Sequence, residues 1–167
     1  MDTYLLKNGS WTCRVFPRVG SNVISLRHGE FPILREPDTE EQLRATPTVF
    51  GIPSLLPPNR TQAGTFTFDS VTYTMPVTET AHNNHLHGTL HISPFEVVEQ
   101  SETSLKTRLI NDLSRFPFPF QLELTDTLTD EGYCRIAEFT NTGSTAMPLV
   151  FAYHATFTAP DYFRIPL

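Results

Sequence analysis

The sequence predicts an all-β fold, an antiparallel β-sandwich in which residues 1–167 form a single domain. Thirteen Phe and fourteen Pro are many for 167 residues, whereas runs of strong helix formers are few. Aromatic residues favour strands, and proline-bearing segments favour the loops between them. Short apolar stretches follow one another at strand-like intervals, separated by turn signals, with no repeat or linker. A chain of this length can bury a core.

The first element expected is a hairpin with strands over 3–7 and 10–16. Asn8 and Gly9 lie between them, and this dipeptide tolerates positive φ at both turn positions. A further strand is expected over 22–28.

One short helix is expected within 36–45. Asp38 or Thr39 can cap it, and acidic residues follow in the first turn, where they favour a helix start.

A second hairpin is expected over 64–75. A two-residue turn at its centre would set Phe68 opposite Val71 and Phe66 opposite Tyr73. Both pairs would then lie on one face, as aromatic and β-branched cross-strand partners do.

Later strands follow at short intervals, and one shows a clear alternation of apolar and polar residues. In "FPFQLELTDTL" the apolar residues from Phe118 to Leu128 share one face, and Asp126 is the one misfit on it. The strands are expected over 89–100, 104–110, 120–128, 133–139 and 149–157, with turns at 130–132 and 141–143.

Composition excludes several classes of function. The formal charge is -6, and the 12 Lys and Arg residues do not cluster, so no nucleic-acid partner is expected. No apolar run approaches the roughly 20 residues that span a bilayer, and no signal peptide is visible. Cys13 and Cys134 have no metal-ligand spacing and fit free thiols in a reducing cytosol. We therefore expect a cytoplasmic protein without a membrane partner.

The end of the sequence, "APDYFRIPL", reads as the start of another strand. A sandwich that stops there would leave open sheet edges, which proteins normally pair or cover. We therefore expect a sandwich that is incomplete at its C-terminus and the N-terminal portion of a longer domain. Open edges also predict self-association.

Four of the six histidines lie in the stretch "HNNHLHGTLH", residues 82–91. His85 and His87 are two apart, so on a strand they would point to the same side and could bind a cation. The acid and glycine frame of a cupin metal site is missing, and no metal is expected. His82 and His91 read as partly exposed strand and turn residues.

His87 and His154 stand in unusual contexts. Asn84 before and Gly88 after His87 indicate a turn that holds the imidazole near backbone amides, and imidazole titrates at about pH 6.5. His154 lies in an apolar segment that predicts a strand. A single histidine there is usually a core residue, and Arg60 alone would be a surface ion-pair partner.

Five motifs in order resemble the aldose 1-epimerase (galactose mutarotase) family. They are "PPNR", "F-T-F…Y", "NNHLHG", "FPFPFQLELTDTL" and "FAYHATF", and the resemblance runs from about Val23 to the end of the chain. It implies a large antiparallel β-sandwich with a shallow, open sugar-binding cleft. Such enzymes interconvert the α and β anomers of free hexoses such as galactose and glucose.

The resemblance also implies roles for individual residues. His154 matches the histidine that protonates the ring oxygen, and His87 matches the second essential histidine. Arg60 matches the arginine that holds sugar hydroxyls, and Asn84 assists. Opening a hemiacetal requires an acid and a base on the two oxygens, and no metal or organic cofactor is implied.

The chain departs from the family pattern at the general base. The family's base is a glutamate far toward the C-terminus, beyond this sequence. Asp161 and Glu138 lie in no motif that supports them as substitutes. Asp126 stands where the family often has an aromatic residue. We therefore expect little or no anomer conversion by these residues alone.

Three other functions remain open at this stage. The same sandwich could be a carbohydrate-binding module without catalysis. A hexose-phosphate epimerase would need further basic residues for the phosphate, such as Arg60 with Arg44 or Arg108. A cupin-like metal oxidoreductase would use His85 and His87.

Overall fold

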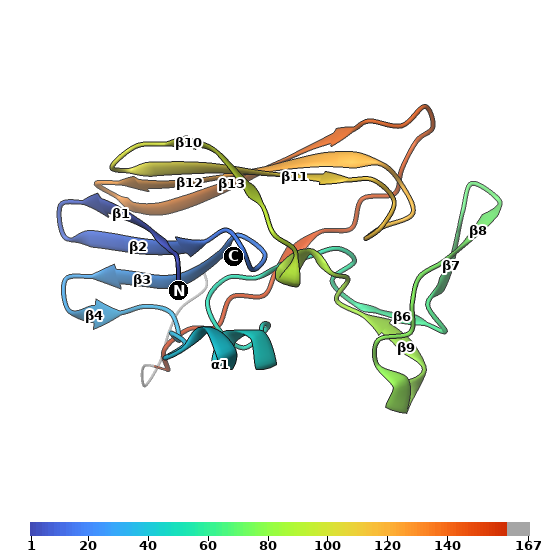
Figure 1. The fold of residues 1–167 in the computed structure, drawn as a ribbon, viewed down its shortest axis with the longest axis horizontal. Helices are drawn as coiled ribbons and strands as arrows, with labels where there is room; N and C mark the ends of the chain where they lie inside the picture. Colours follow the sequence, from blue (N-terminus) through green and yellow to red (C-terminus); the bar gives the residue numbers. More distant parts are fainter. Residues whose placement is uncertain (160–167) are drawn as a thin grey trace.

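The computed structural model describes residues 1–159, which form antiparallel sheets with one short α-helix (Figure 1). The predicted all-β antiparallel fold is confirmed. Two four-stranded sheets carry most of the chain. The first contains, in order, β1 (Tyr4–Asn8), β2 (Trp11–Phe16), β3 (Asn22–His28) and β4 (Phe31–Pro32), and the second contains β10 (Glu96–Gln100), β11 (Ser104–Asn111), β12 (Phe120–Thr129) and β13 (Gly132–Asn141).

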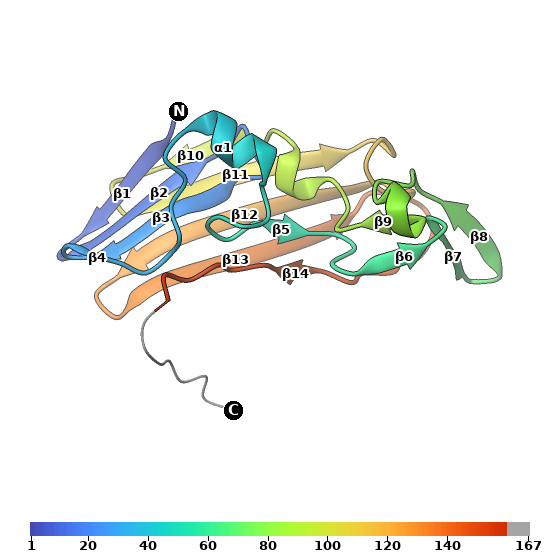
Figure 2. The ribbon, with the colours of Figure 1, turned by 90° about the horizontal axis from the view of Figure 1, so that it is seen from below.

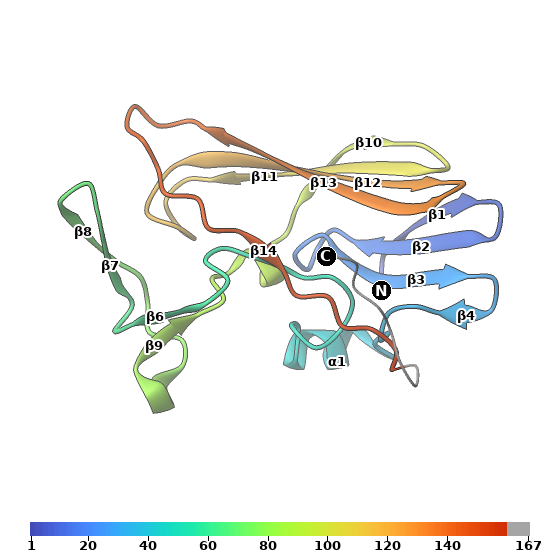
Figure 3. The ribbon, with the colours of Figure 1, turned by 180° about the vertical axis from the view of Figure 1, so that it is seen from behind.

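Three two-stranded sheets complete the described part of the chain. Figures 1 and 3 show the β7–β8 hairpin projecting at the end of the molecule opposite to the first sheet. No helix within residues 1–159 has both the length and the apolarity needed to cross a membrane. The small sheets pair β5 (Ser54–Leu55) with β14 (Ala152–Tyr153), β6 (Arg60–Gln62) with β9 (Asn84–Leu86), and β7 (Thr65–Phe68) with β8 (Val71–Thr74).

The two predicted hairpins form, one of them with a shifted turn. In the β7–β8 hairpin Phe68 pairs with Val71 as predicted, and both turn residues have positive φ. In the first hairpin Asn8 pairs with Trp11, so the turn residues are Gly9 and Ser10 rather than Asn8 and Gly9.

The predicted helix is confirmed as α1 (Glu40–Ala45). Thr39 is its N-cap, because the Gln42 amide donates to the Thr39 hydroxyl oxygen at 3.1 Å. Leu43 is fully buried against Phe16 and Phe50, which ties the helix to the first sheet.

The core follows the alternation seen in β12. Its inward side chains are buried, and pairing with β11 and β13 holds each of them in place. One apolar cluster joins the two four-stranded sheets through Leu6, Cys13, Leu105 and Leu128. A second cluster, rich in phenylalanine, lies under the part of β11 and β12 nearest the β7–β8 hairpin.

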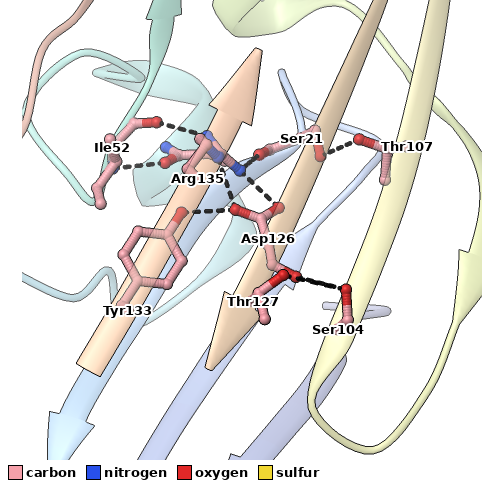
Figure 4. Close-up of polar contacts among 9 residues, drawn as sticks. Ser21, Ile52, Ser104, Thr107, Asp126, Thr127, Tyr133 and Arg135 are labelled. Carbon is pink, nitrogen blue, oxygen red and sulfur yellow. Dashed lines mark hydrogen bonds and ion pairs between the residues drawn. The ribbon is translucent and has the colours of Figure 1, made fainter. Parts of the chain in front are cut away.

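Asp126, the misfit on the apolar face, is a buried ion-pair partner (Figure 4). Its carboxylate accepts from Arg135 Nε at 2.6 Å and from the Tyr133 hydroxyl at 2.5 Å. Arg135 also donates to the carbonyls of Ser21 at 2.6 Å and Ile52 at 3.2 Å. Burial, the largest single cause, would lower the pKa of Arg135, but the charges of Asp126 and Tyr133 and the hydrogen bond to Asp126 together raise that pKa. The network therefore connects the second sheet to the loop before β3 and to the segment between α1 and β5.

Two predicted strands are wrong over most of their length. Within 89–100, a 3-10 turn η2 (Leu90–Ile92) comes first and the strand begins only at Glu96. Within 149–157, only Ala152–Tyr153 forms a strand. It pairs with β5, and the residue before β5 is Pro53, which has no N–H to continue the ladder.

Candidate functional site

Two segments, 56–62 and 84–88, lie side by side and carry most of the predicted site residues. Arg60 pairs with Leu86 across β6 and β9, and Leu56 forms a parallel bridge with Gly88. Gly88 has φ +62°, and a Cβ there would lie 1.8 Å from the Leu56 carbonyl oxygen. Only glycine allows this approach, so the segment after β9 is held against the loop that contains Pro57 and Pro58, called the proline loop below.

His87 is fixed by that proline loop. Its Nδ1 lies 2.6 Å from the carbonyl oxygen of Pro58. Because a carbonyl only accepts, Nδ1 must carry a proton, and in the neutral ring Nε2 is the unprotonated nitrogen. The residue has φ +62°, which ends the alternation of β9 and reorients the side chain. The ring is partly buried.

His154 follows β14 immediately. Its backbone N–H donates to the Pro53 carbonyl at 3.0 Å, so the residue is attached to the segment that leads into β5. Its side chain is exposed rather than part of an apolar strand face. The expectation that it lies within a long strand is therefore wrong.

The structure brings His87 and His154 together. The centroids of the two rings lie 5.9 Å apart and the rings are tilted by 51°. One ring comes from the turn after β9 and the other from the segment that follows β14 (Figure 2). Two imidazole rings from segments distant in the sequence thus lie in contact.

Arg60 and Asn84 meet at Glu79. Arg60 Nε donates to Glu79 Oε2 at 2.8 Å, Arg60 Nη2 donates to Oε1 at 2.8 Å, and Asn84 Nδ2 donates to Oε2 at 2.9 Å. The hydrogen bonds from Arg60 and then from Asn84 lower the pKa of Glu79 to about 2. Glu79 therefore remains a carboxylate at any ordinary pH.

Arg60 and Asn59 also border a cavity of about 350 Å³. Phe66, Phe116 and Val150 form apolar walls of this cavity. Neither imidazole lines it, and the described residues show no hydrogen bond or ring contact between Arg60 and either histidine. The structure thus gives two adjacent groups of site residues, the imidazole pair and the Arg60–Asn84 group.

The other histidines of the stretch have separate places. His85 is buried, and its Nδ1 lies 2.7 Å from the Pro76 carbonyl oxygen, whereas His87 contacts Pro58. The two rings therefore do not share a direction, as an H-x-H strand would require. Residues 1–159 contain no group of three or more potential metal ligands. His82 is exposed as expected.

His91 is buried, contrary to the expectation of partial exposure. It lies in η2, and its backbone packs on Gly20, where a Cβ would lie 2.6 Å from the His91 oxygen. Burial, and then the charge of His87, lower the pKa of His91 to about 4.

Glu79 contacts two of the candidate site residues, and the sequence did not reveal it. It lies 19 positions after Arg60, and the two come together through the pairing of β6 with β9 and the bridge between Glu79 and Asn84. The signal available in sequence was weak, an acid five positions before Asn84 in a segment without strand alternation.

Comparisons with known proteins show similarity in sequence and in fold. Residues 2–165 match the sequence model of the aldose 1-epimerase family. A galactose mutarotase-like protein from Clostridium acetobutylicum is 30% identical, with a TM-score of 0.84 over 92% of this chain and 49% of that one.

More distant solved structures share the fold. A protein from Synechocystis is 24% identical with a TM-score of 0.76, covering 95% of this chain and 55% of that one. A galactose mutarotase-like protein from Lactobacillus casei is 20% identical with a TM-score of 0.68, covering 87% and 46%. The chain therefore spans about half the length of the structures that it matches.

Proposed function

We propose, from the premise that this chain belongs to the aldose 1-epimerase family, that it serves the interconversion of the α and β anomers of a free hexose. The observation that carries the proposal is the pairing of His87 and His154, whose ring centroids are 5.9 Å apart although the residues are distant in sequence. Imidazoles exchange protons near neutral pH, which this reaction requires.

His154 is the proposed acid for ring opening. In its imidazolium form it donates a proton to the ring oxygen while the bond from that oxygen to C1 breaks. A base removes the proton of the C1 hydroxyl, and C1 becomes a carbonyl carbon. Rotation about the C1–C2 bond then presents the other carbonyl face, and the reverse transfers close the ring. Exposure of His154 leaves it accessible to a sugar.

His87 is the proposed partner at the same centre. Because Nδ1 is held by the Pro58 carbonyl at 2.6 Å, Nε2 is the nitrogen available to the substrate. It accepts a hydrogen bond from a sugar hydroxyl when neutral and stabilises developing negative charge when protonated. A ring fixed before the substrate arrives needs no reorganisation during the reaction.

Arg60 and Asn84 are the proposed hydroxyl-binding residues. Both are hydrogen-bonded to one carboxylate, Glu79, which leaves further N–H donors on Arg60 for a ligand. Neutral sugar hydroxyls suit such a charge-compensated group. Arg44 and Arg108 are likewise paired, with Glu40 and Glu96. This supports a free hexose over a hexose phosphate, which would need unpaired cations.

The general base is proposed to lie outside these residues. In the family it is a glutamate toward the C-terminus, and this chain spans about half of the structures that it matches. We therefore expect the 167-residue chain to bind hexose but to accelerate mutarotation little.

The test combines galactose titration, followed by the histidine ring signals in NMR spectra, with polarimetry of α-galactose. His87→Asn and His154→Asn are each expected to weaken galactose binding about tenfold, because each removes a hydrogen bond to the ligand. His28→Asn is the matched control, since His28 is exposed and lies at the end of β3, outside the candidate site.

Four results would contradict the proposal or replace it. Absence of galactose binding, or binding that neither histidine variant alters, would overturn it. Binding with no acceleration, even in a longer chain that supplies the glutamate, would favour a carbohydrate-binding module. Stoichiometric iron, zinc or manganese in chelator-free protein would favour the metal oxidoreductase.

A further inference from the structure

We propose that Glu79 is a positioning residue, which holds Arg60 and Asn84 as one preformed unit for recognition of a pair of neighbouring hydroxyls. This inference deepens the proposed function and rests on it. Glu79 itself is not expected to touch the sugar.

The first support is the number of contacts that Glu79 makes. Its two carboxylate oxygens take both Arg60 Nε and Nη2, at 2.8 Å each, and Asn84 Nδ2 at 2.9 Å. The arginine is therefore bound side-on, in the two-point geometry that fixes the plane of a guanidinium. One carboxylate thus sets the orientation of two separate side chains.

The second support is that Glu79 is itself anchored. Its N–H donates to the Asn84 carbonyl at 2.9 Å, and the Asn84 N–H donates back to the Glu79 carbonyl at 3.2 Å. The side chain of Glu79 is only 16% exposed, whereas that of Arg60 is 58% exposed. Glu79 is thus largely covered, whereas Arg60, which it holds, is exposed to solvent. This is the burial expected if Glu79 positions Arg60 and Arg60 contacts the ligand.

The third support is what remains unused on the two held side chains. A guanidinium has five N–H donors, and Glu79 engages one on Nε and one on Nη2. The rest remain for a ligand, and Arg60 borders the cavity described above. Asn84 donates through Nδ2, which leaves its Oδ1 as an acceptor. Donors beside an acceptor match two adjacent hydroxyl groups, each of which can both accept and donate.

Without Glu79, Arg60 would lose this orientation. A long, half-exposed side chain samples many rotamers, and a ligand must then order it at a cost in affinity. The sugar-binding defect of a Glu79 variant should therefore act through Arg60 rather than add to the loss of Arg60.

The experiment is a double-mutant cycle with the 167-residue chain, using galactose as the probe. Glu79→Gln keeps the size of the side chain and removes its charge. We expect Glu79→Gln to weaken galactose binding about fivefold, Arg60→Gln about tenfold, and the double variant no more than Arg60→Gln alone. Glu79→Asp should recover part of the affinity.

A spectroscopic readout without sugar separates positioning from a general structural role. The Nε–H signal of Arg60 in ¹H–¹⁵N spectra should be sharp and slow to exchange in the unmodified chain. It should broaden or disappear in Glu79→Gln, while the backbone signals of β6 and β9 stay in place. Glu96→Gln is the matched control. Glu96 Oε2 lies 3.0 Å from Arg108 Nη2, in an ion pair outside the candidate site.

The outcomes distinguish this inference from the proposed function. If galactose binds and Arg60→Gln weakens it but Glu79→Gln does not, the positioning role is overturned and the proposed function stands. Additive losses in the double variant, or an unchanged Arg60 signal, also overturn the role. If the unmodified chain binds no galactose, the proposed function fails and the positioning role falls with it.

Discussion

Asp126 and Arg135 form an ion pair between the sheets, and Glu79 and Arg60 form another at the edge of the molecule near the histidines. Both pairs join a carboxylate to the side of a guanidinium through two short hydrogen bonds. The side chains of the first pair are 0% and 3% exposed, whereas Arg60 is 58% exposed. The same carboxylate–guanidinium pair is thus found once in the buried interior and once at the solvent-exposed surface.

The difference lies in what satisfies the remaining N–H donors. Arg135 donates to two backbone carbonyls, and Tyr133 completes the carboxylate of Asp126, so the buried pair is closed by the protein itself. Arg60 keeps donors that no other side chain within residues 1–159 takes up. A buried pair of this kind fixes how the sheets meet, while a half-exposed pair remains able to bind something else.

Breaking the buried pair should give the largest effect. Asp126→Asn leaves the Arg135 charge buried without its counter-charge, and we expect it to lower the free energy of unfolding by about 3–5 kcal/mol. Urea denaturation followed by tryptophan fluorescence of Trp11 measures this loss.

A paired replacement sharpens that prediction. Asp126→Leu combined with Arg135→Met removes both charges, so it should recover most of the stability lost by Asp126→Asn alone. The exposed helix pair Arg44–Glu40 provides the control, and Glu40→Gln should change stability by less than about 0.5 kcal/mol. A single Asp126→Asn variant as stable as Glu40→Gln would contradict the assignment of the buried pair.

His91 gives a second test, since it is a buried polar ring without a carboxylate partner. For Arg135 the neighbouring charges and the hydrogen bond to Asp126 together exceed the effect of burial and raise the pKa. For His91 burial prevails and lowers the pKa from 6.5 to about 4. Between these pH values the unfolded chain binds a proton that the folded chain does not. The free energy of unfolding should therefore fall as the pH drops from 6.5 to 4, by up to about 3 kcal/mol.

Denaturation at several pH values measures this dependence. His91→Gln should remove most of the slope in that window, and His28→Gln, at an exposed position in β3, should leave it. An unchanged slope in His91→Gln would show that another group is responsible.

The sequence could predict much of the fold because strand alternation and turn chemistry are local. The apolar face of β12 and the turn between β7 and β8 were both predicted correctly. Asp126 was recognised as a misfit, but its partner Arg135 was not predicted. The observed two-residue turn at 130–131 sets Arg135 directly opposite Asp126, whereas the turn predicted at 130–132 would have shifted the pairing by one residue.

The site was harder to predict from the sequence, because its contacts depend on tertiary structure. The proximity of His87 and His154 could be expected from a family resemblance, and no spacing rule connects them. The burial of His91 was not predicted, because it depends on the close approach of Gly20, a residue distant in sequence that has no Cβ. Glu79 was missed because the register of β6 and β9 is what brings Arg60 to it.

The smallest effect on stability is expected at the exposed pair. Glu79→Gln should lower the thermal midpoint by no more than about 3 °C, because solvent already screens Arg60 and competes for its donors. Whatever the pair does contribute is present above the ordinary carboxyl pKa of 4.5 and is lost as the pH falls toward 2, since the folded-state pKa is lowered. Thermal unfolding at pH 7 of Glu79→Gln beside Asp126→Asn makes the comparison directly. An ion pair that serves ligand binding can be removed with little loss of stability. If the thermal midpoint of Glu79→Gln is as low as that of Asp126→Asn, the Glu79–Arg60 pair stabilises the fold as much as the buried pair does, and the contrast between the two pairs is wrong.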